Sequence, residues 1–213
     1  MMENKPLVIG VCGGSGSGKT TLIKRLHEEI AHLNPALFTM DNYYRPIETQ
    51  VLDDNGVINF DVPTALDELK LSSDLNQLYQ GNTIEVKEYF FNTYPEKNVL
   101  LTIHPADIIL VEGLFLYYYS DVFKLIDLSI FVEVDPKIQL DRRVYRDQST
   151  RGYKHQDILY QWENHVLPCY HRYIEPYKHH ADFIFKNDQN AEKDFLQLMD
   201  QINALLTRRG ICA

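Results

Sequence analysis

The residue types best suited to chemistry stand together near the start of the chain, in the octet Gly13–Thr20. The octet matches the pattern G-x-x-x-x-G-K-[ST], in which backbone N–H groups curl around a phosphate and glycine supplies the backbone angles that this curl needs. We expect Lys19 to reach the β- and γ-phosphates of a nucleoside triphosphate and the Thr20 hydroxyl to bind Mg²⁺. The predicted ATP-binding residues of this stretch are Gly13, Gly14, Ser15, Gly16, Ser17, Gly18, Lys19, Thr20 and Thr21.

The sequence on either side of the octet decides between a phosphate site and a flexible linker, the commoner use of Gly/Ser-rich stretches. An uninterrupted apolar run at 7–12 predicts a buried strand, and apolar residues at helical spacing after Thr20 predict an amphipathic helix. Such a helix directs its positive N-terminal end at a bound phosphate. A linker would not lie between two such elements, so we interpret the octet as a P-loop.

A second acidic group is expected near Thr20 to complete a metal site. Glu112 lies near the end of the apolar run 107–113, which predicts another buried strand. A carboxylate at the tip of a buried strand is seldom there for packing. We therefore predict Thr20 and Glu112 as the metal-binding residues, with a merely solvated strand end as the alternative.

Asp41 is the candidate for a group that accepts a proton from an attacking hydroxyl. It follows the predicted strand 36–40, within the segment TMDNYY at 39–44. In a parallel sheet, strand ends near the P-loop face the γ-phosphate, and an Asp there can serve as the base of a kinase. The chain lacks the N-K-x-D motif that reads guanine, which argues against a GTPase switch.

A predicted helix that begins at Pro136 carries a cluster of basic residues. Its arginines are Arg142, Arg143, Arg146 and Arg151. With the glycine that follows, they predict a lid over residues 142–155 that closes over triphosphate charge and excludes water. The alternative is a solvated helix face with i,i+4 pairs, some of which Asp141 and Asp147 could supply.

The remaining apolar runs alternate with helical patterns, which is typical of an α/β protein. Strands are predicted at 7–12, 36–40, 107–113, 128–134 and 181–185. Helices are predicted from Thr20 to Asn34, from Pro63 to about Gln80, from Pro136, over roughly 155–174 and from Ala191 to Leu206. These elements predict a single domain over residues 1–213, with a three-layer P-loop fold and a five-stranded parallel sheet.

Residues 83–104 depart from this alternation. Two extended runs, IEVKEYFF and VLLTIH, are separated by the polar stretch NTYPEKN, which contains a proline. The pattern predicts a β-hairpin inserted into the domain rather than another strand–helix–strand unit.

The charge of the chain limits its partners. Lys and Arg number 21 and Asp and Glu number 30, so the formal net charge is −9. Nucleic acid and anionic membranes repel so acidic a chain, and no apolar run approaches the ~20 residues of a membrane helix. The three cysteines are far apart, and no secretory signal pattern opens the chain. We expect a cytoplasmic protein with small-molecule substrates, no nucleic-acid partner and no membrane partner.

Several short motifs follow one another along the chain. They are GGSGSGKT, DNYY, NFD at 59–61, the VEG strand end, RRVYRD with the following RG, and EPYKHHADFIF at 175–185. In this order they resemble the uridine kinase (uridine–cytidine kinase) group of the phosphoribulokinase/uridine kinase family. The resemblance implies transfer of the γ-phosphoryl group of ATP or GTP, with Mg²⁺, to the 5′-hydroxyl of uridine or cytidine in pyrimidine salvage. It also implies a homo-oligomer, either a dimer or a tetramer.

The resemblance assigns further residues to the two substrates. Asp41 matches the family's catalytic acid at the 5′-hydroxyl, and Asp61 matches an aspartate that holds ribose hydroxyls. The hairpin is expected to lie over the nucleoside site. Other matches on the acceptor side are Tyr44, Phe60, Tyr89, Phe91 and Gln161. Arg143, Arg146 and Arg151 match lid arginines; Arg146 and Arg151 are expected to be catalytic with Lys19, and Arg143 to bind ATP.

Two positions depart from the family pattern. The histidine of the hairpin is replaced by Tyr94, and a second ribose-binding arginine, two residues after the Arg-Gly of the lid, is replaced by Tyr153. We expect both tyrosines to bind the acceptor, since a tyrosine hydroxyl donates and accepts hydrogen bonds. The changes leave open a kinase of another ribose-bearing substrate, such as nicotinamide riboside. A non-catalytic nucleotide-binding regulator is a further alternative.

Overall fold

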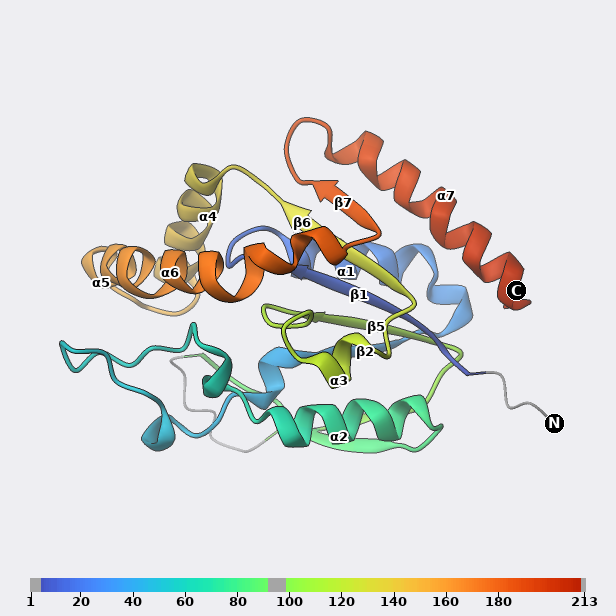
Figure 1. Cartoon of the computed structure of the whole chain (residues 1–213), viewed down its shortest axis with the longest axis horizontal. Coiled ribbons are helices and arrows are strands. Elements are labelled where there is room, and N and C mark those ends of the chain that lie inside the picture. The colour runs from blue at the N-terminus through green and yellow to red at the C-terminus, as the bar shows by residue number, and fades with distance from the viewer. Residues whose placement is uncertain (1–4, 92–98, 212–213) are drawn as a thin grey trace.

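The computed structural model describes residues 5–91 and 99–211 and contains a five-stranded parallel sheet (Figure 1). The strands follow the order β2, β5, β1, β6, β7 across the sheet. Their bounds are β1 (Leu7–Gly13), β2 (Ala36–Thr39), β5 (Ile108–Gly113), β6 (Leu128–Glu133) and β7 (Phe183–Lys186). The predicted α/β fold with its parallel sheet is confirmed.

The central strand β1 and its neighbour β5 are buried along their whole length, as their uninterrupted apolar runs predict. Their register pairs Val11 with Glu112, and β2 is aligned so that Thr39 also pairs with Glu112. On the other side of β1, Gly13 pairs with Val132 of β6. The carboxyl ends of these strands therefore meet at one edge of the sheet.

Helices cover both faces of the sheet, which gives three layers (Figure 1). One face is covered by α1 (Lys19–Glu29) and α7 (Ala191–Arg209). The other is covered by α2 (Glu68–Tyr79), α3 (Ser120–Phe123) and strand β3 (Ile84–Lys87). Fully burying one leucine or isoleucine contributes about 1.5–3 kcal/mol, so apolar contact with the sheet fixes these helices. In the described ranges, no helix has the combination of length and apolar composition that crossing a membrane requires.

Two predicted helix boundaries are wrong, and local chemistry explains both. Pro63 begins a short 3₁₀ turn, and α2 begins only at Glu68 because the Asp67 side chain accepts a hydrogen bond from the Lys70 N–H at 3.1 Å and caps the helix there. Helix α1 ends at Glu29 rather than near Asn34. A 3₁₀ turn follows it, and Asn34, which precedes a proline, has a left-handed backbone with φ 47°.

A continuous helical stretch follows α4 (Pro136–Ser149) and matches the prediction for 155–174. It consists of α5 (His155–Gln161) and α6 (Leu167–Cys169), with π-helical turns at Trp162–Val166 and Tyr170–Ile174. Pro168 lacks an N–H and crowds the preceding turn, and a π-helical turn makes room for it without ending the helix. The last helix, α7, runs to Arg209, where Gly210 ends it with φ 67°.

An antiparallel pair of strands is inserted between α2 and β5. Strands β3 and β4 (Leu100–Ile103) pair with Ile84 opposite Ile103, and the Glu88 N–H donates to the Val99 carbonyl at 2.9 Å. Side chains of β3 alternate between buried and exposed, as expected for a strand with one face on the core. Tyr94 lies outside the described residues.

Candidate functional site

A cleft of about 710 Å³ opens at the carboxyl edge of the sheet and collects most of the predicted site residues. Those that line it are Ser15, Gly16, Gly18, Lys19, Thr20, Thr21, Asp41, Tyr44, Phe60, Asp61, Tyr89, Phe91, Glu112, Arg143, Arg146, Arg151, Tyr153 and Gln161. Gly13, Gly14 and Ser17 belong to the P-loop but do not line the cleft. Segments far apart in the sequence are thus brought to one place.

The P-loop is held in its curled form by its own backbone and by α4. The Ser17 N–H donates to the Gly14 carbonyl at 3.2 Å, and Lys19 Nζ donates to the same oxygen at 3.0 Å. Gly16 has φ 78°, and a Cβ at this position would come within 2.5 Å of the Gln139 carbonyl oxygen. No side chain fits there, so the close approach of α4 requires glycine.

The outer side of the P-loop is fixed by residues that the sequence did not single out for this role. The Ser17 carbonyl accepts hydrogen bonds from Asn187 Nδ2 at 2.6 Å and from Arg142 Nη1 at 3.3 Å. Asn187 directly follows β7, about 170 residues along the chain. From the sequence, Asn187 could have been found only by its position after the last predicted strand, because parallel strands end at the same edge of the sheet.

Glu112 and Thr20 lie together as a metal site requires. Thr20 Oγ1 donates to Glu112 Oε1 at 3.1 Å, and Thr39 Oγ1 donates to the same oxygen at 3.3 Å. Glu112 is only 6% exposed, and burial together with the nearby Asp41 charge raises its pKa. Mg²⁺ binds through one or two carboxylates and other oxygens and keeps several waters. A buried carboxylate next to a hydroxyl fits that ion, whose charge would offset the cost of burial.

Asp41 lies at the start of the 3₁₀ turn that follows β2, where its backbone N–H donates to Thr39 Oγ1 at 3.3 Å. Burial raises the pKa of Asp41, while the positive charges of Lys19 and of two arginines, Arg151 and Arg146, oppose the shift. The carboxylate therefore faces the P-loop lysine and the predicted lid across the cleft. This is a suitable place for a group that accepts a proton from an attacking hydroxyl.

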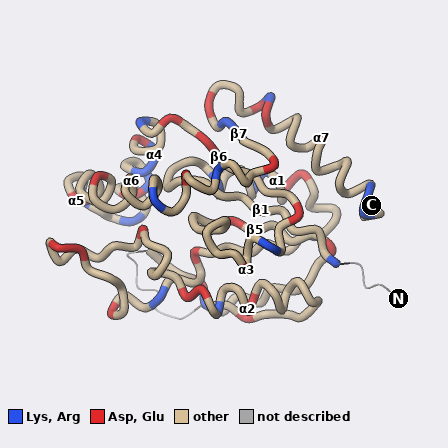
Figure 2. Tube along the Cα trace, viewed as in Figure 1, with Lys and Arg blue, Asp and Glu red and all other residues tan. Residues whose placement is uncertain are grey.

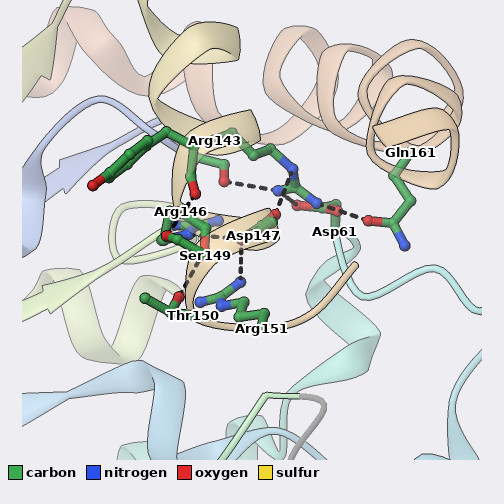
Figure 3. A network of polar contacts seen from close by, with 10 residues as sticks. Asp61, Arg143, Arg146, Asp147, Ser149, Thr150, Arg151 and Gln161 are labelled. Atoms are coloured by element: carbon green, nitrogen blue, oxygen red, sulfur yellow. Dashed lines mark hydrogen bonds and ion pairs between the residues drawn. The ribbon is translucent and has the colours of Figure 1, made fainter. Parts of the chain in front are cut away.

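Three of the four arginines of the predicted lid, Arg143, Arg146 and Arg151, converge on one buried carboxylate, Asp147, which is 1% exposed (Figure 3). Asp147 Oδ1 lies 2.8 Å from Arg146 Nε and 3.3 Å from Arg151 Nη1, and Oδ2 lies 3.3 Å from Arg143 Nε. Asp147 forms i,i+4 pairs with Arg143 and Arg151, as the alternative interpretation allows, but this carboxylate lies inside the protein rather than on a solvated face. Asp147 supplies a shared counter-charge for three guanidinium groups.

Arg143 connects the P-loop with the opposite wall of the cleft (Figure 3). Its Nη1 donates to Ser15 Oγ at 2.8 Å and lies 3.8 Å from Asp61 Oδ1, and its Nη2 donates to Gln161 Oε1 at 3.1 Å. Asp61 is itself buried, and its backbone N–H donates to Asn59 Oδ1 at 2.9 Å. The residue predicted to bind ATP thus lies between the P-loop and the predicted ribose site.

Aromatic side chains form a cluster at the hairpin end of the cleft. Tyr44 lies 5.1 Å from Tyr89 and 5.3 Å from Phe91 between ring centroids, and Phe60 is 6.1 Å from Tyr44. The guanidinium of Arg151 stacks 3.9 Å from the Phe91 ring centre, a cation–π contact between the predicted lid and the hairpin. Asn42, which the sequence did not mark, accepts a hydrogen bond from the Tyr89 N–H at 3.1 Å and ties the hairpin to the Asp41 turn.

Tyr153 lines the cleft together with Gln161 and is partly buried, and burial raises the pKa of its hydroxyl. Figure 2 shows basic residues of α4 gathered at the carboxyl edge of the sheet, although acidic residues predominate in the chain as a whole. The cleft itself is lined by six basic and five acidic residues, so its charges nearly balance in a chain that is acidic as a whole.

Comparisons with known proteins identify the family of the chain. The model of the phosphoribulokinase/uridine kinase family matches residues 8–192. A uridine kinase from Lactobacillus helveticus (strain DPC 4571) is 35% identical over 181 residues, which cover 84% of this chain and 86% of that protein. Uridine-cytidine kinase B from Dictyostelium discoideum is 35% identical over 179 residues, 84% of this chain and 74% of that protein. The fold is similar to phosphoribulokinase from Rhodobacter spheroides, with TM-score 0.65 and 16% identity over 86% of this chain and 71% of that one.

The buried arginine–aspartate cluster gives a prediction for Asp147→Asn. The change keeps the shape of the side chain but removes the shared counter-charge, and removing one partner of a buried ion pair costs about 3–5 kcal/mol. We expect the free energy of unfolding in urea to fall by about that amount. Asp141→Asn on the exposed side of the same helix is the control and should unfold like the wild type. Equal unfolding midpoints for both variants would contradict the assigned role.

The raised pKa of Asp41 gives a second prediction, for Asp41→Asn. In the folded protein the pKa lies above the ordinary value of 3.8, so ionising this carboxyl at neutral pH is less favourable in the fold than in the unfolded chain, and this lowers the stability of the fold. The variant should therefore be more stable than the wild type at neutral pH. The gain should shrink as the pH falls through the raised pKa toward 3.8. Denaturant unfolding of both proteins across this pH range measures the gain in stability. A variant that is less stable than the wild type at neutral pH would contradict the predicted direction.

Proposed function

Because the chain belongs to the phosphoribulokinase/uridine kinase family, we propose that it transfers the γ-phosphoryl group of a nucleoside triphosphate to the 5′-hydroxyl of uridine or cytidine. One observation carries the proposal beyond family membership. Asp41 lines the same cleft as the P-loop lysine, the aromatic side chains and the buried carboxylate of Asp61, and the charges of both Lys19 and Asp61 act on it. This arrangement provides separate places for a phosphate donor and for an acceptor with a hydroxyl group.

On the donor side, the P-loop N–H groups and the N-terminus of α1 hold the phosphates of ATP or GTP. Thr20 and Glu112 are the residues that would hold Mg²⁺, which supplies charge neutralisation at the phosphates when it is bound. Lys19 leaves the Gly14 carbonyl for the stronger acceptor that a phosphate oxygen offers. Arg146 and Arg151 add positive charge from the lid side, and their closure excludes water.

On the acceptor side, the nucleoside base packs among Tyr44, Tyr89 and Phe91, since rings at these spacings offer flat apolar faces. The Asp61 carboxylate accepts hydrogen bonds from two ribose hydroxyls. An acceptor without those hydroxyls would leave a desolvated charge unpaired, which gives strong discrimination. Tyr153 and Gln161 complete the wall on this side.

The transfer step follows from these positions. The 5′-oxygen forms a bond to the γ-phosphorus, the bond from that phosphorus to the β,γ-bridging oxygen breaks, and the hydroxyl proton passes to Asp41. Charge that develops on the transferred group is balanced by Lys19 and the lid arginines. The products are a nucleoside diphosphate and a nucleoside 5′-monophosphate.

The proposal includes the setting that the family resemblance implies. We propose Mg²⁺ as the cofactor, a cytoplasmic location, a homo-oligomer and a role in pyrimidine salvage. The names of the relatives favour uridine and cytidine over nicotinamide riboside and over a non-catalytic regulator.

Release of nucleoside diphosphate in the presence of Mg-ATP or Mg-GTP tests the activity directly. We expect release that depends on uridine or cytidine, with the 5′-monophosphate identified by mass spectrometry, because only these acceptors combine a pyrimidine base with both ribose hydroxyls. The panel also includes 2′-deoxyuridine and nicotinamide riboside. We expect 2′-deoxyuridine to react poorly, because it lacks one of the two ribose hydroxyls and leaves the Asp61 carboxylate without that hydrogen bond. Nucleotide binding without release for any nucleoside would support a regulator and overturn the proposal.

The role of Asp41 is tested by the turnover of Asp41→Asn. Loss of the proton acceptor should lower kcat by about 10²–10⁴-fold, with ATP affinity retained because the P-loop is untouched. Asp121→Asn, an exposed aspartate on α3, is the matched control and should keep wild-type turnover. Normal kcat in the Asp41 variant would remove Asp41 from the mechanism.

A further inference from the structure

Residues 51–61, here called the 51–61 loop, carry Phe60 and Asp61 into the cleft from an exposed position. The loop folds back on itself: Leu52 and Ile58 form an antiparallel bridge, and the Asn59 N–H donates to the Val51 carbonyl at 2.8 Å. Two of its apolar side chains contribute little packing, since Val51 is 50% and Leu52 is 58% exposed, and Val57, Ile58 and Phe60 are only half-buried. A segment with so few buried apolar contacts needs other interactions to hold one position.

Those interactions converge on Asp53 at the tip of the loop. One carboxylate oxygen, Oδ1, accepts hydrogen bonds from the N–H groups of Asn55 at 2.9 Å and Val57 at 2.8 Å, which closes the turn. The other, Oδ2, accepts from the Tyr160 hydroxyl at 2.6 Å and lies 2.8 Å from His165 Nε2. The hydrogen bond from Tyr160 is the main reason why the pKa of Asp53 lies below its usual range.

Tyr160 and His165 join this tip to the wall of the cleft. The Tyr160 hydroxyl also accepts a hydrogen bond from Asn55 Nδ2 at 2.7 Å, and its ring meets the buried His165 ring edge-on, with centroids 5.7 Å apart. Gln161, the residue after Tyr160, accepts from Arg143, which faces Asp61. The loop therefore contacts the helical stretch 155–166 directly at Asp53, and Asp61 is linked to the same stretch through Arg143 of α4, which donates to Gln161.

We propose that Asp53, Tyr160 and His165 are positioning residues for the acceptor, which fix the 51–61 loop so that Asp61 stays opposite Arg143 and Gln161. The Asp61–Arg143 separation of 3.8 Å is too long for a hydrogen bond, so this contact alone does not set the orientation of Asp61. The tip contacts are shorter and involve a charged acceptor, which makes them the stronger restraint. The proposal rests on the proposed function, because it assigns Asp61 to the acceptor.

The variant Tyr160→Phe tests the positioning role, because it removes only the hydroxyl that donates to Asp53. We expect the KM for uridine to rise about tenfold, the value for one lost hydrogen bond to a charged group, while the KM for ATP and the kcat at saturating uridine stay near wild type. Tyr145→Phe, at a tyrosine that is 76% exposed on α4, is the matched control. Asp53→Asn should act in the same direction, and the double variant should add little, because both changes break one network.

Hydrogen exchange of residues 51–61 gives a readout that does not depend on turnover. Exchange should be faster in Tyr160→Phe and in Asp53→Asn than in the wild type and in Tyr145→Phe. A lower melting temperature with unchanged uridine KM and unchanged exchange in the loop would overturn the proposal, since the cluster would then be only a general stabiliser. If no nucleoside is phosphorylated but exchange responds, the proposed function fails while the fixing of the loop stands.

Discussion

The site depends on the register of three parallel strands. Strands β1, β5 and β2 run in the same direction, and Glu112 of β5 pairs with Val11 of β1 on one side and with Thr39 of β2 on the other. The carboxyl ends of the three strands therefore form one continuous edge. The P-loop continues from β1, the Asp41 turn continues from β2, and Glu112 lies between them. A shift of β5 by one residue would turn Glu112 to the other face of the sheet and away from Thr20. The donor half of the site is thus a consequence of sheet geometry.

Charge compensation is the second constraint. The cleft brings together two carboxylates with raised pKa values, Asp41 and Glu112, and arginines that would repel one another. Without compensation, burying these charged carboxylates and arginines would cost folding free energy. Asp147 lowers that cost for the arginines before any phosphate is bound, and Lys19 does so for the carboxylates. A cleft built in this way is ready for a ligand of high negative charge with little rearrangement.

The parts of the protein that the sequence predicts well are those that local patterns determine. Buried parallel strands are continuous apolar runs, and a P-loop is a contiguous motif, so the sheet and the strand-end residues Asp41 and Glu112 followed from sequence. Helix boundaries were less accurate, since α2 begins at Glu68, after its cap Asp67, rather than at Pro63. Contacts between distant segments, such as Asn187 with Ser17 or Asp53 with His165, leave no local pattern. Their residue types are common on surfaces, and only the fold brings them together.

The acceptor half has a different origin from the donor half. Asp61, the hairpin aromatics and Gln161 come from three segments outside the main sheet, which are joined by side-chain contacts rather than by strand pairing. The sequence of such segments can change without disturbing the edge of the sheet that carries the P-loop, because the segments share few backbone hydrogen bonds with that edge. Tyr153, a described position that departs from the family pattern, belongs to this half. The phosphate chemistry is therefore constrained by the sheet, whereas the choice of acceptor depends on how three loosely connected segments are held around Asp61.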